Sequence, residues 1–169
     1  MAKLRLLLCL VYFVSLNAFS LDIKDELKAV AQTNITALFA DDLNAYVSTT
    51  TPDLILVDEI PPFVWKGKNA SARYFKDFKT FTTNFKLTEL KAEVKDAAWI
   101  VEDKNLAYAV FPVNITTRNN EKMKVVGEEG LWTISFKKSK SGKWLLHSSA
   151  WSTLTVSYTH LTLPTKRIV

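Results

Sequence analysis

The chain has 169 residues, of which 48% are hydrophobic and 23% are charged, and these values are typical of one soluble domain with its own core. Its formal charge of +5 comes from the ends: without Lys3, Arg5, Lys166 and Arg167, 18 basic residues face 17 acidic ones. A balance so close to neutral, with clustered lysines only in one predicted turn, excludes a nucleic-acid-binding surface.

Cysteine and histidine are scarce. The single cysteine, Cys9, lies in an apolar run at the N-terminus, and of the two histidines only His147 precedes the C-terminal segment. Disulfides, thiol catalysis and a histidine-rich metal site are therefore excluded from the domain. We expect neither a metal nor another cofactor.

Residues 1–20 have the features of an export signal. Lys3 and Arg5 precede the apolar run from Leu6 to Val14, and small residues then stand where a signal peptidase cuts. A buried helix or a retained anchor is the alternative, but the run is short for a span of about 20 residues. We therefore expect a periplasmic or secreted domain that starts at Leu21 and has no membrane contact after cleavage.

Two helices are predicted first. Apolar residues recur at three- and four-residue spacing from Asp22 to Phe39, which predicts a long amphipathic helix. Asp42 can cap a second, shorter helix that buries Tyr46.

A short strand and a third helix follow. Leu54 to Val57 predicts a buried strand, which delivers Asp58 to its end. Asn69 is a plausible cap for a helix from Ala70 to Phe78, with its aromatic residues turned inward.

From Phe85 onward the apolar period changes to two, which indicates strands. Leu90 to Val94 predicts a strand with one wet face, and a hairpin follows from Trp99 to Thr117. Pro112 cannot donate to a ladder and must mark an edge or a bulge.

The last hairpin organises the core. On its first strand Trp132, Ile134 and Phe136 share a face, and Gly127 and Gly130 permit the bulges of a bent strand. Strict alternation on the second strand turns four residues toward the core, Trp144, Leu146, Ser148 and Ala150. It turns three outward, His147, Ser149 and Trp151.

Helices followed by a run of strands predict an α+β fold, in which the N-terminal helices pack on a strongly curved antiparallel sheet. Such a cone has a packed narrow end and a mouth that can hold a small molecule. We assign residues 21–155 to this one domain.

Residues 156–169 are expected to be a non-native tail. The stretch VSYTHLTLPT, from Val156 to Thr165, has no charge and no helical stripe, and it resembles a translated sequencing adaptor. A genuine polar tail is the alternative.

The chain resembles the NTF2-like superfamily, in particular its SnoaL-like or DUF4440-type domains. Three stretches carry the resemblance: the helix pair from Lys24 to Tyr46, the turn Trp65-Lys66-Gly67-Lys68 with the helix that follows, and the ending from Gly142 to Ser152. The resemblance covers Leu21 to about Leu154 and implies the same cone.

The resemblance also bears on chemistry. Family members often carry pocket histidines on the last strand, and those positions fall on Ser148 and Ala150 here, so the usual histidines are missing. Related isomerases, cyclases and hydratases use an Asp, His or Tyr in the pocket. The candidates in this chain are Asp58, Tyr74 and Tyr108.

Each candidate has a structural alternative. Asp58 could enter the mouth, where burial would raise its pKa toward general-base use, or it could be a solvated strand-end carboxylate. Glu128 could face Ser148 across the hairpin or reach water at a bulge. Trp65, Tyr74 and Trp132 could line an apolar pocket or only pack the core.

Two functions remain open. The first is an exported module that binds a small apolar ligand or associates as a homodimer through the open sheet face, with Trp151 exposed on it. The second is an enzyme of the ketosteroid-isomerase or polyketide-cyclase type, with Asp58 as its general base and a tyrosine that steadies the enolate. The enzyme requires Asp58 and a phenol at one enclosed volume.

Overall fold

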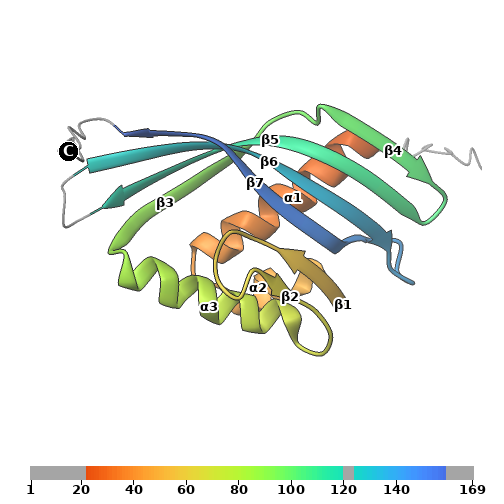
Figure 1. Cartoon of the computed structure of the whole chain (residues 1–169). Coiled ribbons are helices and arrows are strands. Elements are labelled where there is room, and N and C mark those ends of the chain that lie inside the picture. Colours follow the sequence, from red (N-terminus) through yellow and green to blue (C-terminus); the bar gives the residue numbers. More distant parts are fainter. Residues whose placement is uncertain (1–21, 120–123, 159–169) are drawn as a thin grey trace, which may run out of the picture.

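The computed structural model describes residues 22–119 and 124–158, and these residues form three helices and a seven-stranded sheet. The helices are α1 (Ile23–Phe39), α2 (Leu43–Ser48) and α3 (Ala70–Asn84). The strands are β1 (Thr50–Val57), β2 (Val64–Trp65), β3 (Leu87–Val94), β4 (Trp99–Asp103), β5 (Leu106–Asn119), β6 (Lys124–Lys138) and β7 (Trp144–Tyr158). The helices lie together on one side of a strongly curved sheet (Figure 1). The predicted α+β cone is therefore confirmed.

The strand order is β2-β1-β7-β6-β5-β3. Strands β3 and β4 share one edge of β5: β3 pairs with its C-terminal half and β4 with its N-terminal half. Most neighbours are antiparallel, as expected, but β1 runs parallel to β7. The sheet is therefore mixed, because the chain crosses from β1 through the third helix and the whole meander before β7 returns beside it. Pro112 lies between the part of β5 that pairs with β3 and the part that pairs with β4, where no ladder bond is lost.

Local signals explain the helix starts. The Asp22 carboxylate accepts from the Lys24 N–H at the start of α1, and the Asp42 carboxylate accepts from the Ala45 N–H at the start of α2. Asn69 differs from the prediction, because it has a left-handed φ of 58° and makes no side-chain cap bond. The helix that follows also runs six residues beyond Phe78, to Asn84.

The core fills the space between α1 and the concave face of the sheet. Leu27 and Ala31 of α1 are fully buried, and so are Ile134 and Phe136 of β6. Burial of a side chain such as Leu27 contributes about 2 kcal/mol. The predicted inward face of β6 is correct.

The alternation predicted for β7 is wrong beyond Leu146. Phe136 pairs with Leu146, but Ser135 pairs with Ser148, so a bulge at His147 inserts one extra residue. The bulge reverses the parity of the strand as far as Thr153, where a second bulge follows. Ser149 and Trp151 therefore face the helices, while Ser148 and Ala150 face outward.

Both predicted terminal segments lie mainly outside the described residues. The predicted signal peptide, residues 1–20, falls there entirely, and so do residues 159–169 of the predicted tail. Val156 to Tyr158 continue β7 and pair with β6. Within 22–119 and 124–158, no helix is both long and apolar enough to cross a bilayer.

Candidate functional site

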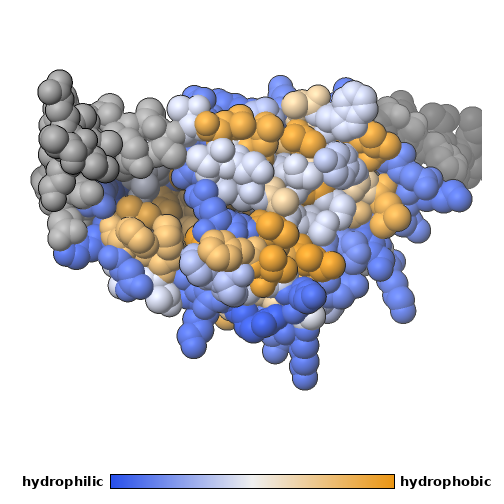
Figure 2. All heavy atoms as spheres, viewed as in Figure 1, coloured by the Kyte–Doolittle hydropathy of each residue, from blue (hydrophilic) through white to orange (hydrophobic). Residues whose placement is uncertain are grey.

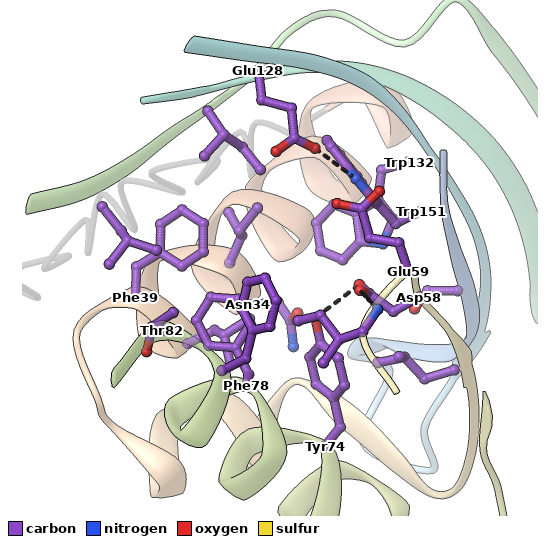
Figure 3. Close-up of a pocket in the computed structure, with 18 of the residues that line it drawn as sticks. Asn34, Phe39, Asp58, Glu59, Tyr74, Phe78, Thr82, Glu128, Trp132 and Trp151 are labelled. Atoms are coloured by element: carbon purple, nitrogen blue, oxygen red, sulfur yellow. Dashed lines mark hydrogen bonds between the residues drawn. The ribbon is translucent and has the colours of Figure 1, made fainter. Parts of the chain in front are cut away.

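A cavity of about 110 Å³ lies between the helices and the concave face of the sheet. Its wall is mainly aromatic and aliphatic, and the polar side chains of Asp58, Glu59 and Glu128 also border it (Figure 3). The aromatic rings come from Phe39, Tyr46, Tyr74, Phe78, Phe81, Trp132 and Trp151. An engineered cavity of about 150 Å³ accepts benzene, so this one suits a molecule of roughly one ring.

Asp58 enters the cavity from the end of β1. Its Oδ1 accepts the Ile60 N–H at 3.1 Å and its Oδ2 accepts the Tyr74 hydroxyl at 2.9 Å. Burial raises the pKa of Asp58 to about 6, against the two hydrogen bonds, which lower it. A carboxylate with such a pKa is ionised at neutral pH and can still accept a proton.

Tyr74 is buried on α3 and is held by other rings. Its ring packs edge-on against Trp65 at 4.8 Å between centroids and tilted against Tyr46 at 6.3 Å. Burial, followed by the charge of Asp58, raises the pKa of Tyr74 well above 10.0. Tyr74 is therefore a phenol at neutral pH, and it acts as a hydrogen-bond donor.

Glu128 lines another part of the wall, from β6. Its Oε1 accepts from Trp151 Nε1 at 3.0 Å and lies 2.8 Å from Thr153 Oγ1. The same Thr153 oxygen lies 2.7 Å from Oε2 of Glu59, which also lines the cavity. Burial raises the pKa of Glu128. Figure 3 shows Glu59, Asp58 and Glu128 around the same space.

Gly130 makes room for Trp151. A Cβ at Gly130 would lie 2.3 Å from Cζ2 of the indole and 2.9 Å from the Ser152 carbonyl oxygen. A bulge beside Gly130, between the pairs of Glu129 and Gly130, is one of the two that bend this hairpin. The extra residue of this bulge is Leu154 on β7, so the bulges expected within β6 at Gly127 and Gly130 are not observed, and β6 pairs with β5 without a register shift. The absent side chain of Gly130 lets the indole cross the strand.

The structure brings four of the predicted site residues to the cavity, Asp58, Tyr74, Glu128 and Trp132. It places the other three elsewhere, and these expectations were wrong. Trp65 is buried in the core and donates its N–H to Asp77 at 2.8 Å. Tyr108 lies on the outer face of the sheet, because Ala107 and Ala109 take the inward positions of β5.

Ser148 is the third misplaced residue. It faces outward because of the bulge, with its hydroxyl 2.6 Å from that of Ser135 and not near Glu128. His147 does not line the cavity either. Its Nδ1 lies 3.2 Å from Thr51 Oγ1 and 3.6 Å from Asp53 Oδ1.

The lining residues that sequence reasoning did not assign to the site include Tyr46, Glu59, Ser149 and Trp151. One feature of the sequence indicated that Ser149 and Trp151 face the core. Trp144 and Trp151 are seven positions apart, an odd number, so both indoles can face the core only if a bulge intervenes. Among the described residues, no group of three His, Cys, Asp or Glu side chains could hold a metal ion.

No protein-family model and no curated protein matches the sequence. Solved structures do match its fold. A ketosteroid isomerase-like protein from Erwinia carotovora atroseptica aligns with a TM-score of 0.61 and 19% identity, over 79% of this chain and 98% of the other. An NTF2-like protein of unknown function from Pseudomonas putida aligns with a TM-score of 0.59 and 16% identity, over 77% and 85%.

A third structure is similar to the same extent. A hexachlorocyclohexane dehydrochlorinase from Novosphingobium barchaimii aligns with a TM-score of 0.66 and 8% identity, over 84% of this chain and 95% of the other. At such identities the likeness concerns the fold and not the chemistry.

Proposed function

We propose that this chain, which has the NTF2-like fold, is an isomerase- or lyase-type enzyme in which Asp58 removes a proton from carbon next to a carbonyl group. One observation carries the proposal: a half-buried carboxylate with a pKa of about 6 lines an apolar cavity and is oriented by a buried phenol. The sequence alone favoured a binding module. The position of Asp58 reverses that order.

The proton transfer is balanced within the site. The C–H bond of the substrate breaks and its proton goes to Asp58, its electron pair forms the C=C bond of the enolate, and the π pair of the carbonyl group moves to the oxygen. Protonated Asp58 is a weaker acceptor for the Tyr74 hydroxyl, so this donor becomes available to the new oxyanion. Return of the proton to a different carbon completes an isomerisation. Loss of a β-substituent completes an elimination.

The cavity restricts the substrate class. Its volume of about 110 Å³ suits one ring. Its apolar wall also lowers the local polarity, which strengthens the hydrogen bonds that hold the enolate. The names of two proteins of similar structure, an isomerase-like protein and a dehydrochlorinase, are consistent with such chemistry.

The test is hydrogen exchange on a small ketone. Cyclohexanone is incubated with the protein in heavy water, and loss of its α-proton signal is followed by NMR. We expect Asp58→Asn to slow the exchange by about a hundredfold or more. Asp53→Asn is the matched control, since Asp53 lies exposed on the same strand and away from the cavity. Equal rates in wild type and Asp58→Asn would contradict the proposal.

A binding module is the second candidate. It is favoured by the hydrogen bonds that already occupy both oxygens of Asp58, Ile60 N–H on one and Tyr74 on the other. Such a module takes a small apolar ligand into the same cavity without reaction. Ligand binding that is unchanged in Asp58→Asn, together with no catalysed exchange, would select it.

We also propose a homodimer through the outer face of the sheet. The dimer expected from the sequence rests on an exposed Trp151. Because Trp151 faces inward, that support is lost, but another feature of the sheet supports a dimer. The central facing residues of β1, β5, β6 and β7 are uncharged, with Glu129 and Lys137 of β6 toward the two ends of that face, and Figure 2 shows mainly apolar and weakly polar side chains over these strands. They include Ile55, Val57, Tyr108, Val110, Leu131, Thr133, Ser135, Ser148, Ala150 and Ser152.

Export is proposed from the N-terminal sequence. Lys3, Arg5 and the apolar run from Leu6 to Val14 support it. Mass spectrometry of the protein expressed with its own N-terminus tests it. We expect a mature chain that begins at Leu21 and is found outside the cytoplasm, and an intact N-terminus would contradict it.

A further inference from the structure

The charged groups around the cavity all have one sign. Asp58, Glu59 and Glu128 line it, and none of its described lining residues is Lys, Arg or His. Within the described part of the chain these three carboxylates have no ion-pair partner. Their charges also repel one another: Glu59 and Glu128 each raise the pKa of Asp58, and Glu59 raises that of Glu128.

Thr153 only partly relieves this repulsion. Its hydroxyl lies within hydrogen-bond distance of Glu59 Oε2 and Glu128 Oε1, but it has a single hydrogen and can donate to only one of them at a time. The Trp151 N–H donates to the same Glu128 oxygen. The second oxygen of each glutamate, Oε1 of Glu59 and Oε2 of Glu128, accepts no hydrogen bond from the described residues. Glu128 is half-buried, so its second oxygen faces the cavity without a protein donor, whereas Glu59 is exposed and its second oxygen is open to solvent.

The aromatic wall is independent of the carboxylates and favours the same kind of ligand. Tyr46, Tyr74, Trp132 and Trp151 line the cavity together with three phenylalanine rings. The face of an aromatic ring attracts a cation, and most strongly where water is excluded. No described group of carboxylates has the arrangement of a metal site. An organic cation therefore fits better than a metal ion.

We propose that the cavity selects a small ammonium compound, about one ring in size, whose N–H groups donate to Glu59 and Glu128 while its apolar body lies against the aromatic wall. The inference rests on the proposed function only in taking this cavity as the substrate site. It also names the substrate class: an ammonium group bound at the glutamates would place the ring of the substrate near Asp58, the proposed base.

Three probes of similar shape test the inference. Benzylamine is a cation near neutral pH, benzyl alcohol is neutral, and benzoate is an anion. Their dissociation constants are measured by calorimetry with the full chain at about pH 7.5 and low salt. We expect benzylamine to bind at least about tenfold more tightly than benzyl alcohol, and benzoate more weakly than either.

Variants assign the preference to the glutamates. Glu128→Gln keeps an acceptor for Trp151 and removes the charge, and we expect it to weaken benzylamine binding by about five- to tenfold without affecting benzyl alcohol. Glu59→Gln should act in the same direction. Glu129→Gln is the matched control, because Glu129 is exposed and does not line the cavity. Within each variant, the affinity for benzylamine is divided by the affinity for benzyl alcohol. A damaged fold weakens the binding of both, so its effect cancels in this ratio.

The outcomes separate this inference from the proposed function. Equal affinity for benzylamine and benzyl alcohol, tighter binding of benzoate, or binding of none of the three overturns the ammonium preference. Exchange of neutral cyclohexanone that depends on Asp58 would still support proton transfer. Conversely, selective binding of benzylamine without any Asp58-dependent exchange supports the ammonium site and leaves the protein a binding module.

Discussion

The hydroxyl of Tyr74 donates to Oδ2 of Asp58 at 2.9 Å, joining the third helix to the end of the first strand across the mouth of an apolar cavity. The bond orients the carboxylate and lowers its pKa, while burial raises it more. The site therefore holds a carboxylate that is costly to ionise but fixed in position. Its consequences can be measured.

Asp58→Asn is expected to stabilise the fold while it removes activity. The pKa of Asp58 is about 6 in the folded protein and near 3.9 in an unfolded chain, so the folded state binds the proton more tightly. The contribution of this group to stability is thus largest at low pH and is lost as pH rises from about 4 to 6. At about pH 8 the variant should be more stable by up to about 3 kcal/mol.

Urea unfolding of both proteins at about pH 4 and pH 8 checks this expectation. The difference in the free energy of unfolding between wild type and Asp58→Asn should be small at the lower pH and reach its full value at the higher one. A variant that unfolds more readily than wild type at the higher pH would contradict the assigned cost of ionisation.

The pH profile of catalysis should report the same group. Only ionised Asp58 can accept a proton, so kcat/KM for α-proton exchange should rise with pH and level off above an apparent pKa of about 6. Tyr74→Phe removes a donor that lowers this pKa, so the midpoint should move upward. It should also lower the rate by about ten- to a hundredfold, through loss of a donor to the enolate. A midpoint that stays in place would contradict the role of the phenol.

Gly130→Ala tests the packing of Trp151 against the strand. The added methyl group would meet the indole at 2.3 Å, so we expect a loss of stability of about 1–3 kcal/mol. The matched experiment repeats the substitution in a Trp151→Leu background, where the ring is gone. Thermal unfolding of the four proteins gives the coupling. An equal cost in both backgrounds would show that the strand, and not the indole, demands glycine.

Tyr108→Lys is expected to separate a dimer formed through the outer face. Tyr108 is 42% exposed and lies between the uncharged Ser135 and Val101 of the neighbouring strands, so a lysine from each copy would place two like charges in the interface. Sedimentation equilibrium at micromolar concentration should show a dimer for wild type and a monomer for the variant. Val47→Lys, on α2 and equally exposed, is the control. A wild-type monomer would contradict the proposal.

Much of the fold was predictable because its signals are local. The stripe of α1 repeats every three or four residues, the carboxylates of Asp22 and Asp42 cap the helices, and alternation set the inward face of β6. Asp58 could be placed at the end of a buried strand by the same reasoning. Its entry into the cavity could not, because that depends on where α3 lies.

The sequence by itself determined the class of fold and the short list of acids and phenols from which a site could be built. Only the tertiary structure decided which of them meet. One extra residue at His147 exchanges Ser148 for Ser149 and brings Trp151 inside, and the packing of α3 against β1 sets Asp58 beside Tyr74. The physical reason is that the side to which a strand residue points is predicted from the residues next to it in the sequence. A bulge is fixed by partners on other strands, which local periodicity does not record.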